Sequence, residues 1–149
     1  SSALSIRSSP TTATRLPPAT PPNMPVLDTS ALLYWTLAPE RLSKRAQSTI
    51  DGSPELLVSS ISLWEVGLKA SKGKLQLPVS IREYTERLSA VDRVEILDVD
   101  LETWLCNLEL AWEHRDPADR TIVATASVRG CPLVTSDAAI LDYYSNAIW

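Results

Sequence analysis

The chain has 149 residues and a formal net charge of −4. Its length suits one domain with a hydrophobic core, and its 44% of apolar residues excludes a wholly disordered chain. No stretch approaches the roughly 18 apolar residues that cross a bilayer, which excludes a transmembrane helix. The acidic balance argues against a protein that coats nucleic acid through a broad basic surface. One histidine and two separated cysteines exclude a zinc site built from several such ligands, and the cysteines favour a reducing compartment.

The composition changes near Met24, the only methionine of the chain. Residues 1–23 contain five prolines, many serines and threonines and no acidic residue, so they cannot bury enough apolar surface to fold. We expect a disordered extension or an artefact there, although Arg7, Arg15 and the many serines loosely resemble an organelle transit peptide. The domain is expected over residues 24–149, with Met24 as a candidate natural start. No apolar segment of a secretion signal precedes Met24, which predicts a cytoplasmic protein.

The first half of the domain is predicted to contain a strand, two helices, a strand and a helix, over residues 25–28, 31–37, 39–50, 55–59 and 60–72. The last of these helices is expected to begin at Ser60 or Ser62 and to end at Gly73, because serine caps helix starts and glycine favours helix ends.

The second half is predicted to contain a helix, a strand, two helices, a strand, a short helix and a candidate edge strand, over residues 80–91, 94–99, 101–112, 117–130, 132–135, 138–144 and 147–149. Short apolar strands that alternate with helices indicate an α/β fold with a short parallel sheet of four to five strands, covered by helices on both faces. In such sheets, ligands bind beyond the carboxyl ends of the strands.

Four acidic residues are predicted to lie at or near those ends. Asp28 ends the first strand and Asp137 the fourth, while Glu65 and Asp119 lie in adjoining helices. Bringing four carboxylates together without a cation would be costly, and a divalent ion removes the conflict. Oxygen ligands favour Mg²⁺ or Mn²⁺ over zinc. Such an ion could position a water, assist its deprotonation and stabilise charge on a phosphodiester.

Each acid also has a purely structural explanation. Asp28 and Asp137 could cap the helices that follow them. Asp116, Pro117 and Asp119 fit the first positions of a helix, with or without catalysis. Glu65 could pair with a lysine four residues later on a solvated helix face. The joint placement of the acids, rather than any one of them, favours a metal site.

Four segments resemble a known family. VLDTSALLYW (26–35), SSISLWEVGLKASKGKL (59–75), HRDPADRTIVATA (114–126) and PLVTSD (132–137) resemble the PIN domain and, more narrowly, the VapC-type toxins of bacterial toxin–antitoxin pairs. The resemblance spans essentially all of residues 24–149, with the motifs in the family's order. It implies a PIN-like three-layer α/β/α fold and a Mg²⁺- or Mn²⁺-dependent endoribonuclease that hydrolyses RNA. It further implies a homodimer held inactive by a cognate antitoxin.

The resemblance also assigns site residues. It places the catalytic and metal-binding carboxylates at Asp28, Glu65, Asp119 and Asp137. Asp116 belongs to the HRDPADR segment and is placed as a helix cap or a residue behind the ligands. Small hydroxyl residues that could orient carboxylates or water match Thr29 and Ser136.

Several cations and aromatic residues have both a functional and a structural interpretation. Arg115 and Arg120 could hold RNA phosphate or antitoxin acids, or pair with neighbouring acids. His114 suits a structural or RNA-stacking role better than that of a general base. Lys69, Lys72 and Lys74 form a small basic cluster around the end of the Glu65 helix, which a solvated helix face explains equally well. Trp64 could line an antitoxin or RNA groove, or belong to the core or an interface.

Two alternatives to a toxin remain open from the sequence. One is a PIN nuclease of RNA maturation that has no antitoxin. The other is a binding module that keeps the fold and has lost cleavage. The intact set of four acids argues against the second, because a scaffold has no need to keep them together.

Overall fold

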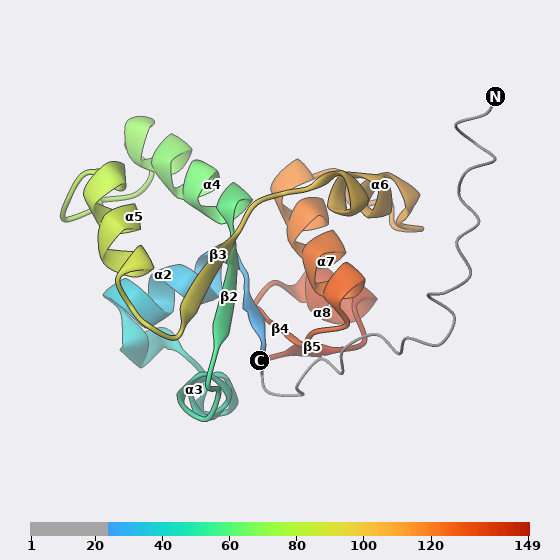
Figure 1. The fold of residues 1–149 in the computed structure, drawn as a ribbon, viewed down its shortest axis with the longest axis horizontal. Coiled ribbons are helices and arrows are strands. Elements are labelled where there is room, and N and C mark those ends of the chain that lie inside the picture. The colour runs from blue at the N-terminus through green and yellow to red at the C-terminus, as the bar shows by residue number, and fades with distance from the viewer. Residues whose placement is uncertain (1–23) are drawn as a thin grey trace, which may run out of the picture.

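The computed structural model describes residues 24–149, and the extension expected over residues 1–23 lies outside the described part. Within residues 24–149, five parallel strands form one sheet in the order β3-β2-β1-β4-β5 (Figure 1). The strands are β1 Val26–Leu27, β2 Leu56–Ser59, β3 Val94–Leu97, β4 Leu133–Val134 and β5 Ala147–Ile148. The predicted α/β fold with a short parallel sheet is confirmed, and the edge strand at the carboxyl end is present.

The helices are α2 Thr29–Leu37, α3 Lys44–Asp51, α4 Ser60–Ser71, α5 Ile81–Ser89, α6 Leu101–Glu109, α7 Pro117–Arg129 and α8 Ala138–Tyr143, with a 3₁₀ turn, η2, at Pro39–Arg41. Two of the predicted helices differ from the structure in a way that has a local cause. The helix expected over 39–50 is divided, because Leu42 is extended and the Ser43 side chain caps a new helix by accepting the N–H of Ala46. The helix expected over 101–112 ends at Glu109.

Side chains of the strands alternate between two apolar cores, one on each face of the sheet. Leu27, Val58 and Val134 point to the face covered by α2, α3 and α5. Val26, Leu57 and Leu133 point to the opposite face, where α7 and α8 cover them. This alternation follows from the two-residue period of a strand and produces the expected three layers (Figure 1).

The helices that carry the candidate acids are fixed at their ends. Asp116 caps α7 by accepting the N–H groups of Ala118 and Asp119, and Gly130 closes that helix with a φ of 66°, which glycine adopts without strain. Ser59, the last residue of β2, caps α4, and α4 then packs against α2, α5 and α7. The helix starts at the carboxyl edge of the sheet are therefore rigidly placed.

No helix among the described residues is long and apolar enough to cross a membrane.

Candidate active site at the carboxyl edge of the sheet

Asp28 follows β1 directly and is 4% exposed. Its Oδ1 accepts the N–H of Ala31 at 2.8 Å and the hydroxyl of Ser30 at 3.1 Å, so Asp28 caps α2. Its Oδ2 accepts the hydroxyl of Thr135, which follows β4. The carboxylate is thus held from two neighbouring strands, and it fulfils the capping role as well as a place in the candidate site.

Burial raises the pKa of Asp28 from 3.8 to about 6. Hydrogen bonds from Thr135, Ala31 and Ser30 oppose this rise, and the nearby charge of Asp119 adds to it. The hydrogen-bond donors stabilise the ionised carboxylate of Asp28, whereas burial disfavours the ionised form. A cation placed beside Asp28 would resolve the conflict.

Asp119 lies in the first turn of α7 and is held by His114. The Nε2 of His114 donates to the Oδ2 of Asp119 at 2.8 Å. The imidazole stacks on Trp112 with ring centroids 4.6 Å apart, and Trp112 stacks on Tyr143 of α8 at 4.7 Å. This stack of three rings fixes the plane of His114, and His114 in turn orients the Asp119 carboxylate. The contact matches the structural role that the sequence favoured for His114.

Electrostatic repulsion links Asp119 to the other acids. Burial raises the pKa of Asp119, the hydrogen bond from His114 lowers it, and the charges of Asp116 and Asp137 raise it further. Asp137 caps α8, since its Oδ1 accepts the N–H groups of Ala139 and Ile140. Asp28, Asp119 and Asp137 therefore form one group of interacting carboxylates, which we call the acidic edge.

Glu65 makes its ion pair with a lysine of its own helix and not with the acidic edge. It pairs with Lys69 one turn later in α4, at 3.6 Å, and its side chain is 15% exposed. Glu65 and Asp116 line the same groove between α4 and α7. The structure thus brings Glu65 towards the capping residue of α7, and it gives Glu65 the lysine partner that its spacing predicted.

The hydroxyl residues around Asp28 differ from those expected. Thr29 is buried and donates to the hydroxyl of Ser62 in α4, so it orients no carboxylate. The hydroxyl of Ser136 lies 3.4 Å from the hydroxyl of Ser30, which itself donates to Asp28. Thr135 and Ser30 hold Asp28 instead. The register that pairs Leu27 with Val134 puts Thr135 beside Asp28, and this pairing of β1 with β4 is not visible in the sequence.

Arg120 does not face the acidic edge as a free cation. Its guanidinium donates to the side chain and carbonyl of Asn107 and to the carbonyls of Leu110, Trp112 and His114. These bonds give Arg120 a structural role, in which it holds the segment that bears His114. Arg115 is exposed at the surface next to Asp116.

The acids match a metal ion in their chemistry but not in their present arrangement. Within residues 24–149, no three His, Cys, Asp or Glu side chains are grouped closely enough to hold one as they stand. The donor chemistry nevertheless fits Mg²⁺ or Mn²⁺, because the acidic edge offers only oxygen, the charge of Asp119 raises the pKa of Asp28, and the charge of Asp137 raises the pKa of Asp119. Joint binding would require these carboxylates to turn towards one another.

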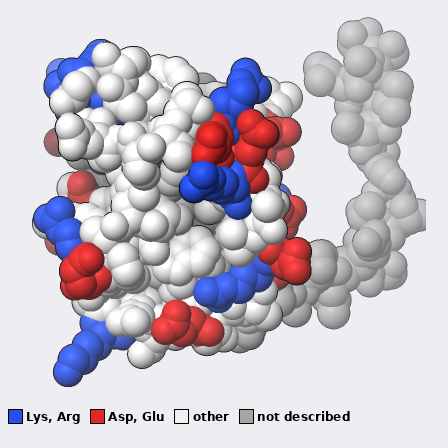
Figure 2. Space-filling model, turned by 90° about the vertical axis from the view of Figure 1, so that its left-hand side faces the viewer, with Lys and Arg blue, Asp and Glu red and all other residues white. Residues whose placement is uncertain are grey.

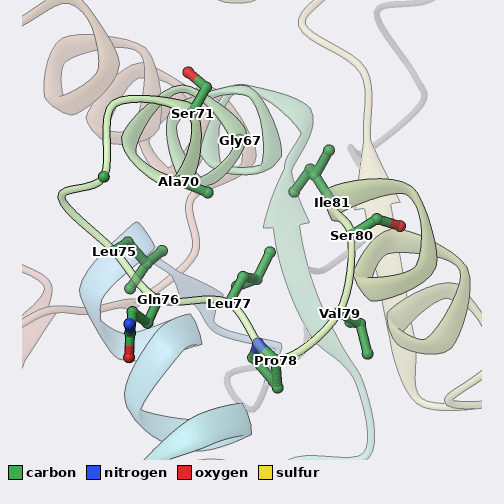
Figure 3. Close-up of a pocket in the computed structure, with 11 residues that line it drawn as sticks. Gly67, Ala70, Ser71, Leu75, Gln76, Leu77, Pro78, Val79, Ser80 and Ile81 are labelled. Atoms are coloured by element: carbon green, nitrogen blue, oxygen red, sulfur yellow. The ribbon is translucent and has the colours of Figure 1, made fainter.

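A pocket larger than the groove between Glu65 and Asp116 lies outside the acidic edge. It has a volume of about 760 Å³ and is lined by residues of α4, the connection after it and the start of α5, among them Gly67, Leu77 and Ile81 (Figure 3). In the close-up, Leu77 and Ile81 project between α4 and the connecting segment. The residues that line it include no acidic side chain. Cavity size therefore does not identify the candidate site, whereas the chemistry of the acidic edge does.

Comparisons with known proteins agree with this architecture. The family model of the PIN domain matches residues 26–146. Ribonuclease VapC22 of Mycobacterium tuberculosis is 31% identical over 112 residues, which cover 75% of this chain and 85% of that protein.

Solved structures share the fold. A toxin–antitoxin complex from Klebsiella pneumoniae superposes with a TM-score of 0.60 at 17% identity, covering 84% of this chain and 96% of that one. FitAcB from Neisseria gonorrhoeae superposes with a TM-score of 0.59 at 19% identity, covering 85% and 96%. With the family model matching most of the chain, the protein belongs to the PIN domain family.

Proposed function

We propose that this protein is a metal-dependent endoribonuclease toxin of the cytoplasm, which acts as a homodimer and is neutralised by a cognate antitoxin. The observation that carries the proposal is the acidic edge, where the buried Asp28 after β1, the half-buried Asp137 after β4 and the half-buried Asp119 at the start of α7 interact through their charges within a PIN fold. The similarity to Ribonuclease VapC22 supports RNA as the substrate. The likeness of the fold to toxins in toxin–antitoxin complexes is compatible with an antitoxin partner.

In this proposal, Asp28, Asp119 and Asp137 hold the ion, and Glu65 supports it from α4. Asp28 is kept in place by Thr135 and Ser30, and Asp119 by His114. When bound, Mg²⁺ or Mn²⁺ supplies a positioned, more acidic water and offsets the negative charge on the phosphodiester. One carboxylate of the acidic edge would accept the proton of the attacking water. No histidine is needed as a base, and His114 keeps Asp119 in position.

RNA cleavage by the purified protein tests the proposal. We expect hydrolysis of single-stranded RNA with Mg²⁺ or Mn²⁺ and none with EDTA. Asp119→Asn should lower the rate at least about a hundredfold, because it removes one charge of the site and leaves the shape unchanged. Asp92→Asn, an exposed acid in the turn before β3, is the matched control and should cleave like the wild type. Equal cleavage by wild type, Asn variant and EDTA sample would refute the assignment.

A further inference from the structure

A groove of about 250 Å³ lies between α4 and the start of α7. Glu65 lines it on the α4 side and Asp116 on the α7 side. The remaining α4 side of this groove, which we call the Trp64 groove, is formed by an aromatic ring, a leucine and three lysines: Trp64, Leu68, Lys69, Lys72 and Lys74. The groove therefore places cations and an aromatic surface beside Glu65, one of the four acids assigned to the proposed site.

The helical repeat explains this composition. Trp64, Leu68 and Lys72 follow one another at four-residue spacing, so α4 presents them along one side. Trp64 is 56% exposed, although tryptophan is the side chain with the largest surface to bury. An exposed indole in a groove offers a flat face on which an unpaired base can stack.

The turn after α4 holds the lysine backbone in a fixed shape. Gly73 has a φ of 71°, and the N–H of Lys74 donates to the carbonyl of Lys69 at 2.9 Å. Lysines near a helix carboxyl end also interact favourably with the helix dipole. That interaction explains Lys72 and Lys74 without a ligand, but it does not explain the exposed Trp64 that shares their groove.

We propose that the Trp64 groove binds single-stranded RNA, with one base stacked on the indole and phosphates held by Lys72 and Lys74. This inference rests on the proposed ribonuclease function. Three lysines against two acids leave the groove with a positive excess. Stacking on an aromatic ring requires an unstacked base, which favours single strands over duplex.

The charge distribution on one face of the molecule agrees with local binding of this kind. On the face shown in Figure 2, basic and acidic side chains are interspersed, and no broad basic area extends across it. The net charge of −4 agrees with this picture. RNA is therefore held by a few cations and one ring rather than by the overall field of the protein.

Binding of a fluorescein-labelled single-stranded oligouridylate in EDTA, followed by anisotropy, tests the proposal without cleavage. Trp64→Ala should raise the Kd about tenfold, while Trp64→Phe, which keeps an aromatic face, should stay close to the wild type. Lys72→Ala together with Lys74→Ala should reduce the slope of log affinity against log salt by about 0.7 for each lysine.

Matched controls lie outside the groove. Leu37→Ala removes an exposed apolar side chain of α2, and Lys44→Ala removes an exposed cation of α3. Both should leave the Kd and its salt dependence unchanged. An unchanged Kd in Trp64→Ala would overturn the proposal, and so would a Trp64 variant that loses a protein partner but keeps its RNA affinity.

The two proposals fail in different ways. If the wild type binds RNA through Trp64 but cleaves none with Mg²⁺ or Mn²⁺, the nuclease assignment is refuted and RNA binding by the Trp64 groove is retained. If the wild type cleaves RNA and Trp64→Ala cleaves it with the same KM, RNA binding by the Trp64 groove is refuted and the nuclease assignment is retained.

Discussion

At the scale of single residues, Asp28 shows how a site can be prepared for an ion before the ion arrives. Three donors, from Ser30, Ala31 and Thr135, converge on its two oxygens. They hold the carboxylate in one orientation, yet burial keeps its pKa near 6. At neutral pH the buried charge of Asp28 therefore lowers the free energy of unfolding, and a neutral side chain at this position would avoid that loss.

Asp28→Asn should stabilise the metal-free protein at neutral pH. Because the folded pKa of about 6 lies above the unfolded 3.8, the favourable contribution of Asp28 is complete below pH 3.8 and is lost as the pH rises through 6. Asparagine stays neutral and caps helices as well as aspartate does. We expect the variant to gain on the order of 1–3 kcal/mol at pH 7.5 in EDTA, measured by urea unfolding.

The pH series provides the decisive comparison. The difference between wild type and Asp28→Asn should be small at pH 4 and grow towards pH 7. Asp92→Asn, an exposed acid, should stay within about 0.5 kcal/mol of the wild type throughout. A variant that is less stable than the wild type at pH 7.5 would show that the hydrogen bonds outweigh the burial of the charge.

The same residue shows what the sequence could and could not predict. The place of Asp28 at a strand end was evident, because an apolar run stops there. The partner of Asp28 was not evident, since Thr29 and Thr135 are both hydroxyl residues beside proposed acids. Only the pairing of β1 with β4 decides that Thr135 contacts Asp28, while Thr29 turns to Ser62. Strand order is a property of the whole fold and leaves no local signal.

At the scale of elements, the connection between α6 and α7 determines where His114 lies. Residues 110–116 contain no helix or strand, and Arg120 holds them by donating to the carbonyls of Leu110, Trp112 and His114. Arg120 also donates a hydrogen bond to the carbonyl of Asn107, near the end of α6. This explains why α6 ends at Glu109, although the apolar pattern continues to Trp112. A long-range side chain ended the helix, so the local pattern could not show it.

Arg120→Met should destabilise the protein by about 2–4 kcal/mol in urea unfolding, because several carbonyls lose a charged donor. Arg120→Lys should recover only part of this loss, since an ammonium group cannot reproduce the planar fork of a guanidinium. Arg115→Met is the matched control at the exposed neighbouring position and should cost less than about 0.5 kcal/mol. Equal losses for the Arg120 and Arg115 methionine variants would contradict the structural role of Arg120.

At the scale of the whole molecule, α6 leaves an apolar surface uncovered. Leu101, Trp104, Leu105 and Leu108 lie three, four and seven residues apart, which places them on one face, and Leu108 is 79% exposed. An apolar helix face of this kind on a domain in water is typical of a protein–protein interface. The homodimer expected from the family resemblance gives this face a partner, since a twofold axis brings the same face of a second copy against it.

The double variant Leu105→Glu and Leu108→Glu should convert the dimer to a monomer, because two like-charged pairs would then face each other across the twofold axis. Light scattering coupled to size exclusion measures the mass directly. Leu37→Glu, at an exposed leucine of α2 on the other side of the sheet, is the control and should keep the dimer. Unfolding midpoints compared at equal concentration separate loss of the interface from loss of the fold. A wild type that is monomeric, or a double variant that remains dimeric, would show that α6 faces a different partner.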